Sequence, residues 1–361
     1  MALAPSSAAP THALDFAPLR VLVERSLARR SGGPADVAFE PMPGGASTRR
    51  YFRVRYGDAT AVAMFVPEGA KAEEIAKPGN HARWPFLEVR DLLASRGVDV
   101  PAVYDEDTAR GWLLLEDLGD DTLAAYLAVR PQAKESLYVR AVDDLARAQR
   151  SLAVLPPASV VATRAFDEDL LLWEIQHFRE WGLEARGIRV TPEQRAAFDA
   201  IAGRLARRIA GFSRVVVHRD YQSRNLMVRP DAAGGCKSLC WIDFQDALLG
   251  PRVYDLVALL SDSYQVFERD FVEARLDDYA RATGLGADGR RALGREFDQV
   301  TVQRKLKDAG RFVFIDRTKG NSSFLKFVEP TIAKVRASVA RLADEEDMRV
   351  LADLLDRLVP G

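Results

Sequence analysis

Two short polar motifs in the middle of the sequence combine side chains that are suited to phosphoryl transfer. The first reads H-R-D-x-x-x-x-N from His218 to Asn225 after a run of three valines, and the second begins at Asp243 after another short apolar run. Phosphoryl transfer needs a carboxylate that accepts the proton of an acceptor hydroxyl, and oxygen ligands for a Mg²⁺ ion on the nucleotide phosphates. The motifs therefore predict Asp220 as the catalytic base and Asn225 and Asp243 as metal ligands.

The same residues also have a simpler interpretation. Asp and Asn commonly cap turns, so that Asp220, Asn225 and Asp243 would each close a local turn. The apolar run before each motif favours the catalytic interpretation, because it predicts strands that deliver both carboxylates to one cleft. His218 would either titrate near neutral pH or hydrogen-bond to hold the loop, and we assign it the structural role.

The segments around these motifs predict a strand-rich beginning and a helical remainder. Short apolar runs on both sides of a glycine turn at 44–48 predict an antiparallel meander between residues 37 and 67. A helix is expected from Trp84 to Ser95, and the apolar strand 111–119 ends in acidic and glycine residues that form a plausible hinge. Long helices are then predicted at 122–130, 132–152, 166–183 and 192–209, with short β-like pieces at 215–217 and 239–242.

The segment from His218 to Asp262 resembles the aminoglycoside phosphotransferase superfamily, whose fold choline and sugar kinases share. This resemblance implies an α+β, bilobal, eukaryotic-protein-kinase-like fold with a small antiparallel-sheet N-lobe and a larger, mainly helical C-lobe. We expect a disordered tail at 1–15, a nucleotide-binding N-lobe at 16–115, and a C-lobe at 116–361 with the catalytic loop, the metal site and the sugar site. ATP and Mg²⁺ are the cofactors that it implies.

Three further segments, 44–54, 113–119 and 303–312, resemble one branch of that superfamily, the bacterial anomeric N-acetylmuramate/N-acetylglucosamine kinases. This resemblance implies ATP-dependent phosphorylation of the anomeric hydroxyl of an amino sugar, giving a sugar 1-phosphate for peptidoglycan recycling. It also implies an adenine-binding hinge and a glycine turn over the nucleotide. The hinge would be Glu116, Asp117 and Leu118, and the turn would use Gly44, Gly45, Ser47, Thr48 and Arg49.

One departure from the wider kinase pattern concerns the third strand. Protein kinases carry a lysine there that pairs with the nucleotide phosphates and with a helix glutamate, whereas this chain has Met64 at the corresponding place. Glu88 is then a candidate glutamate without its usual partner. Arg49 or Arg50 would supply the missing positive charge, since guanidinium groups bind phosphate in a bidentate manner. The alternative is that both are solvated arginines at a strand edge.

The acceptor residues are less well defined by the sequence. We take Asp220, Arg224, Asp262, His177, Arg311 and Arg317 as candidate substrate contacts. The helical spacing of Trp173, His177 and Trp181 makes one aromatic face, which is either core or a platform for a sugar. Arg311, Arg317 and Lys319 flank residues 320–323, which we expect to form a loop that reaches the cleft; the alternative is a basic helix end.

Composition narrows the function classes. Lys and Arg total 51 against 52 for Asp and Glu, and the net charge of −1 gives no reason to expect nucleic acid or a membrane surface as a partner. The chain has no apolar run of the roughly 20 residues that span a bilayer, and Cys236 and Cys240 are expected to be reduced thiols, so we predict a cytoplasmic protein. The oligomeric state is not predicted.

Two other functions compete with the amino-sugar kinase. An aminoglycoside or another hydroxyl compound is one alternative acceptor, but a polycationic aminoglycoside needs carboxylates, and the region 304–319 is basic. A pseudokinase that binds partners is the other alternative. Met64 favours it, whereas the intact set of Asp220, Asn225 and Asp243 argues against it.

Overall fold

The structure of the chain is a computed structural model that describes residues 14–31, 36–43, 48–67 and 83–360. The chain forms two compact units, one of Met1–Ala72 with Pro101–Asp117 and one of Glu73–Val100 with Leu118–Gly361. Gly44, Gly45 and Ser47 of the predicted nucleotide turn, and most of the predicted tail, lie outside the described residues.

The first unit contains an antiparallel sheet of five strands in the order β1-β2-β3-β5-β4. In β2, Phe52, Val54 and Tyr56 are buried at every second position, as expected for a strand with one face on a core. A two-residue turn joins β2 to β3, and Gly57 in that turn has a positive φ of 56°. The strands are β1 (Val37–Pro41), β2 (Arg50–Tyr56), β3 (Ala59–Phe65), β4 (Val103–Asp107) and β5 (Trp112–Glu116).

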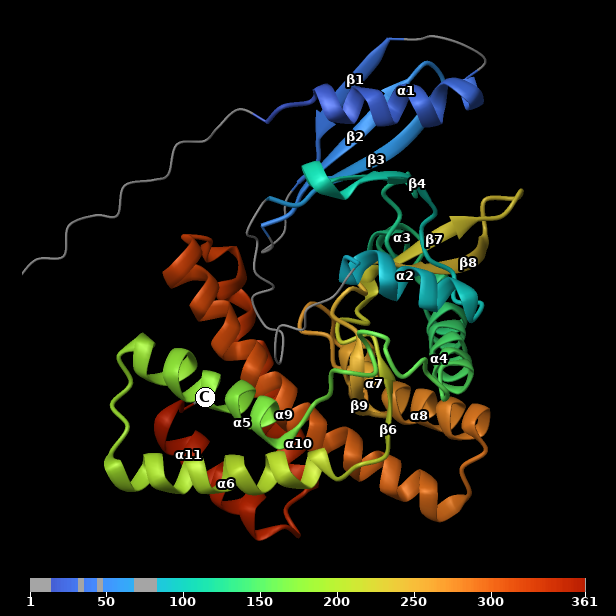
Figure 1. Cartoon of the computed structure of the whole chain (residues 1–361). Helices are drawn as coiled ribbons and strands as arrows, with labels where there is room; N and C mark the ends of the chain where they lie inside the picture. Colours follow the sequence, from blue (N-terminus) through green and yellow to red (C-terminus); the bar gives the residue numbers. More distant parts are fainter. Residues whose placement is uncertain (1–13, 32–35, 44–47, 68–82, 361) are drawn as a thin grey trace, which may run out of the picture. The chain divides into compact units, whose positions relative to one another are not determined.

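Helix α1 (Ala17–Ser31) covers one face of this sheet (Figure 1). Its apolar residues pack against sheet residues such as Phe52 and Trp112. The sequence analysis did not predict this helix. Four of its buried residues nevertheless follow the helical spacing i, i+3, i+4 and i+8: Leu19, Leu22, Val23 and Leu27.

The second unit is mainly helical and contains two small antiparallel sheets, β6 with β9 and β7 with β8. Together the two units confirm the predicted α+β, kinase-like fold class. The strands are β6 (Arg214–Val217), β7 (Leu226–Pro230), β8 (Cys236–Trp241) and β9 (Leu248–Pro251). The helices are α2 (Pro85–Ser95), α3 (Leu123–Val129), α4 (Lys134–Ser151), α5 (Glu168–His177), α6 (Pro192–Ala210), α7 (Tyr254–Leu260), α8 (Arg269–Thr283), α9 (Ala287–Lys319), α10 (Val328–Arg341) and α11 (Glu346–Leu358).

Helix α2 packs within the second unit, although the sequence analysis placed it in the 16–115 lobe. Phe86 stacks on Phe244 with 5.1 Å between ring centroids. In the segment that follows the helix, the carbonyl of Asp99 accepts from the backbone nitrogen of Trp241 at 2.8 Å. These contacts join α2 and its exit segment to the region of the second motif.

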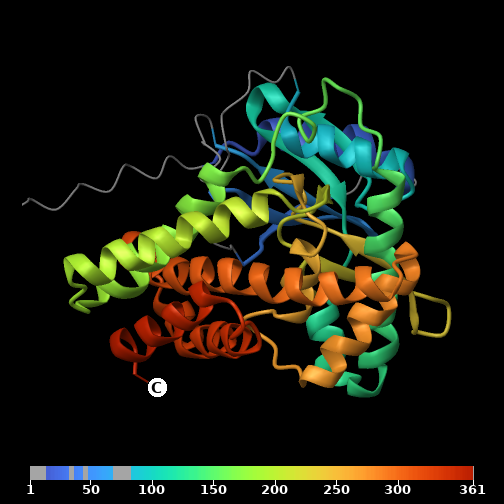
Figure 2. The same ribbon diagram turned by 90° about the horizontal axis from the view of Figure 1, so that it is seen from below.

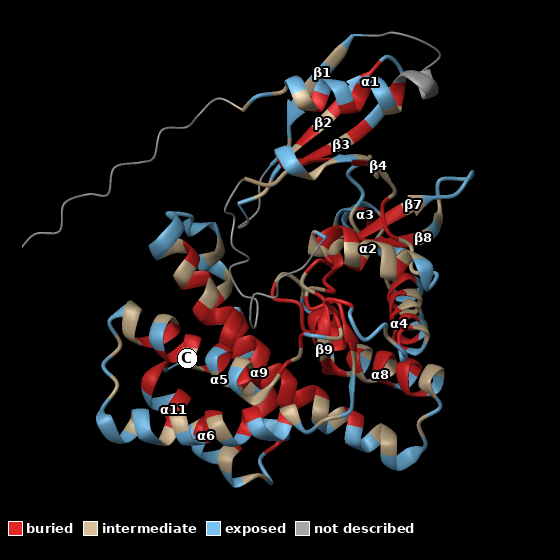
Figure 3. Cartoon of the chain, in the orientation of Figure 1, coloured by how far each residue is buried: buried red, intermediate tan, exposed pale blue. Residues whose placement is uncertain are grey.

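Helix α9 crosses the second unit over 33 residues (Figure 2), and its middle is buried (Figure 3). It packs against α5 and α10. At the crossing with α5, Gly310 lies so close to the partner backbone that a Cβ there would lie 2.7 Å from the carbonyl carbon of His177. Only glycine permits this approach, so the sequence sets how near α9 comes to α5.

Two predicted elements differ from the structure. The helix expected at 166–183 is α5 followed by a π-helical turn, Phe178–Leu183, in which the hydrogen-bond spacing widens. The loop expected at 320–323 is shorter than predicted: α9 ends at Lys319, Gly320 and Asn321 form the connection, and a short 3₁₀ helix begins at Ser322 (Ser322–Phe327). Gly320 ends α9 with a φ of 66°, and the side chain of Asn321 caps the next turn by accepting from the nitrogen of Ser323.

Candidate active site

The two sheets of the second unit bring the two polar motifs together. The first motif occupies the loop between β6 and β7, and Asp243 follows β8, which pairs with β7. The backbone nitrogen of Ile242 donates to the carbonyl of Asn225 at 3.0 Å, which joins the end of the first motif to the start of the second. Asp220, Asn225 and Asp243 therefore belong to one hydrogen-bonded loop assembly.

The side chain of Asp255 on α7 holds the backbone of the catalytic loop. Its two carboxylate oxygens accept from the backbone nitrogens of His218 at 2.6 Å and Arg219 at 3.0 Å. Arg219 has a φ of 79°, a left-handed conformation that costs energy for a residue with a side chain and needs such support. Full burial raises the pKa of Asp255 to about 7, although both N–H donors and Arg304 favour the ionised form. These contacts give Asp255 a role in bracing the loop.

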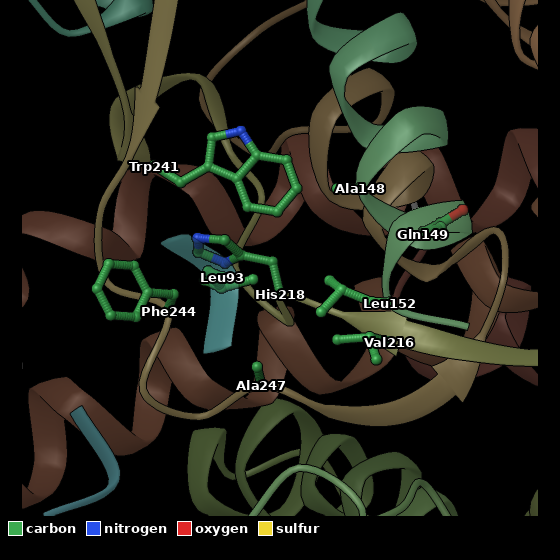
Figure 4. Close-up of a pocket in the computed structure, with 9 residues that line it drawn as sticks. All are labelled: Leu93, Ala148, Gln149, Leu152, Val216, His218, Trp241, Phe244 and Ala247. Atoms are coloured by element: carbon green, nitrogen blue, oxygen red, sulfur yellow. The ribbon is translucent and has the colours of Figure 1, made fainter. Parts of the chain in front are cut away.

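His218 is fixed in one neutral tautomer. The backbone nitrogen of Asp220 donates to His218 Nδ1 at 3.3 Å, so the proton belongs on Nε2, which donates to the carbonyl of Ile242 at 3.0 Å. Burial lowers the pKa of His218, although Asp220 and Asp243 act against this shift. The ring also faces a small, mostly apolar cavity beside Trp241 and Phe244 (Figure 4). These contacts give His218 a role in holding the loop.

Asp220 is the third residue of this loop, and 39% of its side chain is exposed. Its Oδ1 accepts from Arg304 Nη2 on α9 at 3.0 Å. Desolvation raises the pKa of Asp220, but the positive charges of Arg304, Lys307 and Arg219 outweigh it and hold the pKa well below its ordinary value. Asp220 is therefore ionised at neutral pH and able to accept a proton.

Asn225 and Asp243 offer oxygen ligands of the kind that Mg²⁺ prefers. The side-chain nitrogen of Asn225 donates to the backbone carbonyl of Asp220 at 2.8 Å, which turns its Oδ1 away from that bond. Asp243 is exposed, has a φ of 64°, and accepts from Gln245 Nε2 at 3.1 Å. Within the described ranges, no group of three His, Cys, Asp or Glu side chains forms a metal site of its own. The donors fit Mg²⁺, which uses one or two carboxylates together with water and phosphate oxygens.

The predicted nucleotide contacts in the first unit are partly engaged with their own neighbours. Glu116 accepts from the nitrogen of Ala102 at 3.0 Å, and Asp117 pairs with Arg53 at 3.1 Å. Leu118 is the first residue of the second unit after this strand. The backbone of this segment thus remains the predicted adenine contact, because hinge recognition uses main-chain groups.

The place of the usual kinase lysine and its glutamate is defined by the structure. Met64 is fully buried in β3, opposite Tyr51 and Leu113 in the neighbouring strands. Glu88 accepts a hydrogen bond from the backbone nitrogen of Val160, so it has a structural partner in the second unit. Thr48 is exposed, Arg49 is half-buried, and Arg50 lies 5.7 Å from the ring of Phe52. Phosphate binding by Thr48 and these arginines stays a prediction.

Asp262 and Arg224 occupy different positions with respect to the loop. Asp262 is fully buried, where it accepts from Ser223 Oγ at 3.0 Å and from the nitrogen of Tyr264 at 3.1 Å. It therefore supports the loop through Ser223, and its buried carboxylate is not exposed to a ligand. Arg224 is exposed, lies 3.9 Å from the ring centre of Tyr264 and donates to the Tyr264 hydroxyl at 2.6 Å.

The aromatic face of α5 is part core and part surface. His177 is buried, with its ring 5.4 Å from Phe314 of α9 and 5.5 Å from Trp173, which is 42% exposed. The guanidinium of Arg311 lies 4.8 Å from the ring centre of Phe314. Arg317 is 59% exposed near the end of α9. Neither alternative for the aromatic face, core or sugar platform, holds for all of its members.

Arg304 is the residue that the sequence analysis did not assign. It lies in the segment 303–312, which resembled the sugar-kinase branch, but it received no role there. Its side chain is 1% exposed and its guanidinium contacts the predicted base, although the two residues are 84 positions apart. The available signal was the run Gln303-Arg304-Lys305 inside a helix that also carries apolar residues; burial of these polar residues could not be inferred from it.

Comparison with known proteins identifies the family. The model of the phosphotransferase enzyme family APH matches residues 38–294, and the chain belongs to this family. A protein of Pseudomonas aeruginosa named N-acetylmuramate/N-acetylglucosamine kinase is 34% identical over 91% of this chain and 90% of its own length. A protein of the same name from Pseudomonas putida is 32% identical over 88% of this chain and 87% of its own. The chain is therefore a kinase of this phosphotransferase family, as the sequence analysis predicted.

Solved structures agree on the fold. The choline kinase LicA from Streptococcus pneumoniae matches 91% of this chain and 100% of its own with a TM-score of 0.53 and 16% identity, which bears on the fold alone. In the part of the chain that the structure describes, no helix has the length and apolarity to cross a membrane.

Proposed function

We propose that this protein uses ATP and Mg²⁺ to phosphorylate the anomeric hydroxyl of N-acetylmuramate and N-acetylglucosamine, in the cytoplasm, to give sugar 1-phosphates for peptidoglycan recycling. The observation that carries the proposal is the loop assembly of Asp220, Asn225 and Asp243. The names of the two Pseudomonas relatives support the choice of acceptor.

In the proposed reaction Asp220 accepts the proton of the sugar hydroxyl. The hydroxyl oxygen forms a bond to the γ-phosphorus of ATP as the bond from that phosphorus to the bridging oxygen breaks, and its electron pair stays on ADP. Asp220 Oδ1 is bonded to Arg304, which leaves Oδ2 for the proton. Mg²⁺, held by Asn225 and Asp243, would neutralise charge on the phosphates.

A positive face of α9 supports an acceptor that carries a carboxylate. Arg304, Lys307 and Arg311 follow the spacing i, i+3 and i+7, which places them on one side of the helix. The rise of 1.5 Å per residue puts Arg311 about 10 Å along the axis from Arg304. N-acetylmuramate differs from N-acetylglucosamine by a lactyl carboxylate. We propose that Lys307 and Arg311 form the edge of the sugar site that meets it.

Arg317 occupies another side of α9. It follows Arg304 by 13 residues, which is about 220° around the helix. Its side chain is 59% exposed and lies 3.7 Å from Asp316. Within the predicted group of basic residues, Arg311 is therefore the stronger candidate for the carboxylate, and Arg317 provides a comparison on the same helix.

The test is ATP consumption with a panel of acceptors, with and without Mg²⁺, followed by NMR identification of the phosphorylated carbon. The panel contains both amino sugars, their 1-O-methyl glycosides, choline and an aminoglycoside. We expect turnover with the free amino sugars, none with the glycosides, and phosphate on C1. Turnover with the 1-O-methyl glycosides would show that another hydroxyl is the acceptor. The variant Asp220→Asn should bind ATP normally and turn over about 10²–10⁴ times more slowly, which is the usual contribution of a general base.

A further inference from the structure

We propose that Arg304 is a positioning residue for the catalytic base, which fixes Asp220 by one guanidinium nitrogen and the backbone beside it by another. The proposal rests on the proposed function, because it takes Asp220 as the base. It assigns a catalytic purpose to a part of α9 that lies 84 residues beyond Asp220 in the sequence.

The geometry is that of a fork with two points of contact. Arg304 Nη2 donates to Asp220 Oδ1 at 3.0 Å, and Nη1 donates to the backbone carbonyl of Arg219 at 2.6 Å. A planar guanidinium that binds two groups sets their direction as well as their distance. With one oxygen and the preceding carbonyl both held, rotation of the Asp220 carboxylate is restricted, and Oδ2 keeps one orientation toward the acceptor.

Arg304 is itself held firmly. Its side chain is 1% exposed, and its guanidinium lies 4.8 Å from the ring centre of Tyr254 on α7. Tyr254 is the neighbour of Asp255, which holds the same loop through its backbone nitrogens. A buried charge needs such partners to offset the loss of its hydration. The fork is therefore rigid with respect to both α7 and the loop.

The residue before Arg304 holds the other side of the loop. Gln303 Nε2 donates to Glu174 Oε2 at 2.7 Å, and Glu174 Oε1 accepts from Arg219 Nη2 at 3.3 Å. All three side chains are buried. Two consecutive residues of α9 thus fix two consecutive residues of the loop, Arg219 through Glu174 and Asp220 directly. A bond that served folding alone would not need to end on the reacting carboxylate.

A double-mutant cycle distinguishes positioning from a structural role. We expect Arg304→Gln to lower kcat about 10–100-fold while the KM for ATP changes less than threefold. In the Asp220→Asn background the same substitution should lower kcat less than threefold, because a base that no longer accepts a proton has nothing left to position. Equal losses in both backgrounds would overturn the proposal.

Two further measurements apply if Arg304→Gln folds poorly. Arg304→Lys keeps the charge but has a single donor group, which cannot form the fork, so we expect an intermediate kcat. Guanidinium ion at low millimolar concentration should restore part of the kcat of Arg304→Ala. A wild-type kcat for Arg304→Lys would contradict the fork, and so would the absence of rescue in folded Arg304→Ala.

Arg275→Gln provides the matched control. Arg275 on α8 is also a buried arginine. It donates to Asp278 on the same helix at 2.5 Å, and neither residue belongs to the catalytic loop. Its loss should lower the unfolding midpoint and leave kcat within twofold. The proposed function and this inference fail separately: full turnover of Asp220→Asn refutes the base itself, whereas a large loss in Asp220→Asn combined with additive effects refutes only the role of Arg304.

Discussion

Asp220 and Asp255 support one loop, yet their surroundings shift their pKa values in opposite directions. Desolvation raises both values. At Asp220 the charges of Arg304 and Lys307 outweigh desolvation, whereas at Asp255 two backbone donors and the charge of Arg304 do not. The proposed base, Asp220, is therefore an ionised carboxylate in the loop, and the carboxylate of Asp255 on α7 holds the loop backbone.

Asp243→Asn tests the metal site at the level of one residue. The change removes the negative charge of a ligand but keeps its size, so Mg²⁺ and the nucleotide it accompanies should bind more weakly. We expect kcat to fall to near background, and titration of ATP in the presence of Mg²⁺ to show a higher Kd. Asp246→Asn is the control, because Asp246 lies three residues after Asp243 and accepts a hydrogen bond from the same Gln245 side chain. An unchanged dependence of turnover on Mg²⁺ in Asp243→Asn would refute its assignment.

Arg311→Ala tests recognition of the lactyl carboxylate. A charge-assisted hydrogen bond is worth about 1.5–3 kcal/mol when sheltered, so kcat/KM for N-acetylmuramate should fall about 10–100-fold. N-acetylglucosamine lacks the carboxylate, and its kcat/KM should change less than threefold. Arg317→Ala, on another side of the same helix, should affect neither sugar. Equal losses for both sugars in Arg311→Ala would exclude this role.

The sequence predicted the residues that lie in one local motif and not those that meet it from elsewhere. Asp220, Asn225 and Asp243 were proposed because their spacing and the preceding apolar runs lie within the 29 residues from Val215 to Asp243. Arg304 reaches the same loop only through the packing of α9, which local patterns do not specify. Asp262 was proposed as a substrate contact, but the structure buries it against Ser223. This burial depends on tertiary structure, so the local sequence did not reveal it.

At the scale of elements, α9 connects the catalytic loop to the rest of the second unit. It carries Arg304 at one point and crosses α5 closely at Gly310. Periodicity predicted helices as far as residue 209, and the family resemblance implied a mainly helical C-lobe, but neither predicted how closely α9 crosses α5. The π-helical turn after α5 was also not predicted, because a widened hydrogen-bond spacing leaves no simple apolar pattern. Four strands of the first unit, β1, β2, β3 and β5, were predicted because their apolar patterns are local, whereas β4 was not predicted.

Gly310→Ala tests how closely α9 must approach α5. The added Cβ would lie 2.7 Å from the carbonyl carbon of His177, so the two helices must move apart. Overpacking of this kind lowers the free energy of unfolding by about 1–3 kcal/mol. We expect a lower urea midpoint and a lower kcat, since α9 also carries Arg304.

Gly203→Ala is the matched control on α6. Apart from its chain neighbours and the backbone of its own helix, no described atom lies within 4 Å of a Cβ at that position, so alanine should stabilise the helix by about 0.5–1 kcal/mol and leave kcat unchanged. Gly310→Ala with wild-type stability would show that the crossing adapts without cost.

At the scale of the whole molecule, the chain divides its residues between two units in a way that sequence order does not follow. The segment containing α2 belongs with the helical unit, whereas the strands β4 and β5 that come after it return to the sheet of the first unit. The sequence indicated the order of elements but not this exchange, because the contacts of Phe86 and Asp99 are formed with residues about 140–160 positions later.

Asp255→Asn tests the pH dependence of the stability of the folded chain. Folding raises the pKa of this carboxyl from its ordinary value near 4 to about 7, because burial disfavours the charged form. Below pH 4 the group is protonated in both states, and its stabilising contribution is complete. As the pH rises toward 7, the unfolded chain loses the proton first, so this contribution is progressively lost. Above pH 7 both states are ionised and the loss is complete.

The free energy of unfolding, measured in urea at pH 5 and pH 8, should therefore decrease more for the wild type than for Asp255→Asn. A shift of one pKa unit corresponds to about 1.4 kcal/mol, so the difference between the two proteins should change by about 3 kcal/mol over this range. Asp277→Asn, an exposed carboxylate on α8, should follow the wild type. Parallel pH profiles for the wild type and Asp255→Asn would mean that the donors from His218 and Arg219 keep the carboxylate ionised throughout. In that case the buried brace under the catalytic loop would be a fixed negative charge.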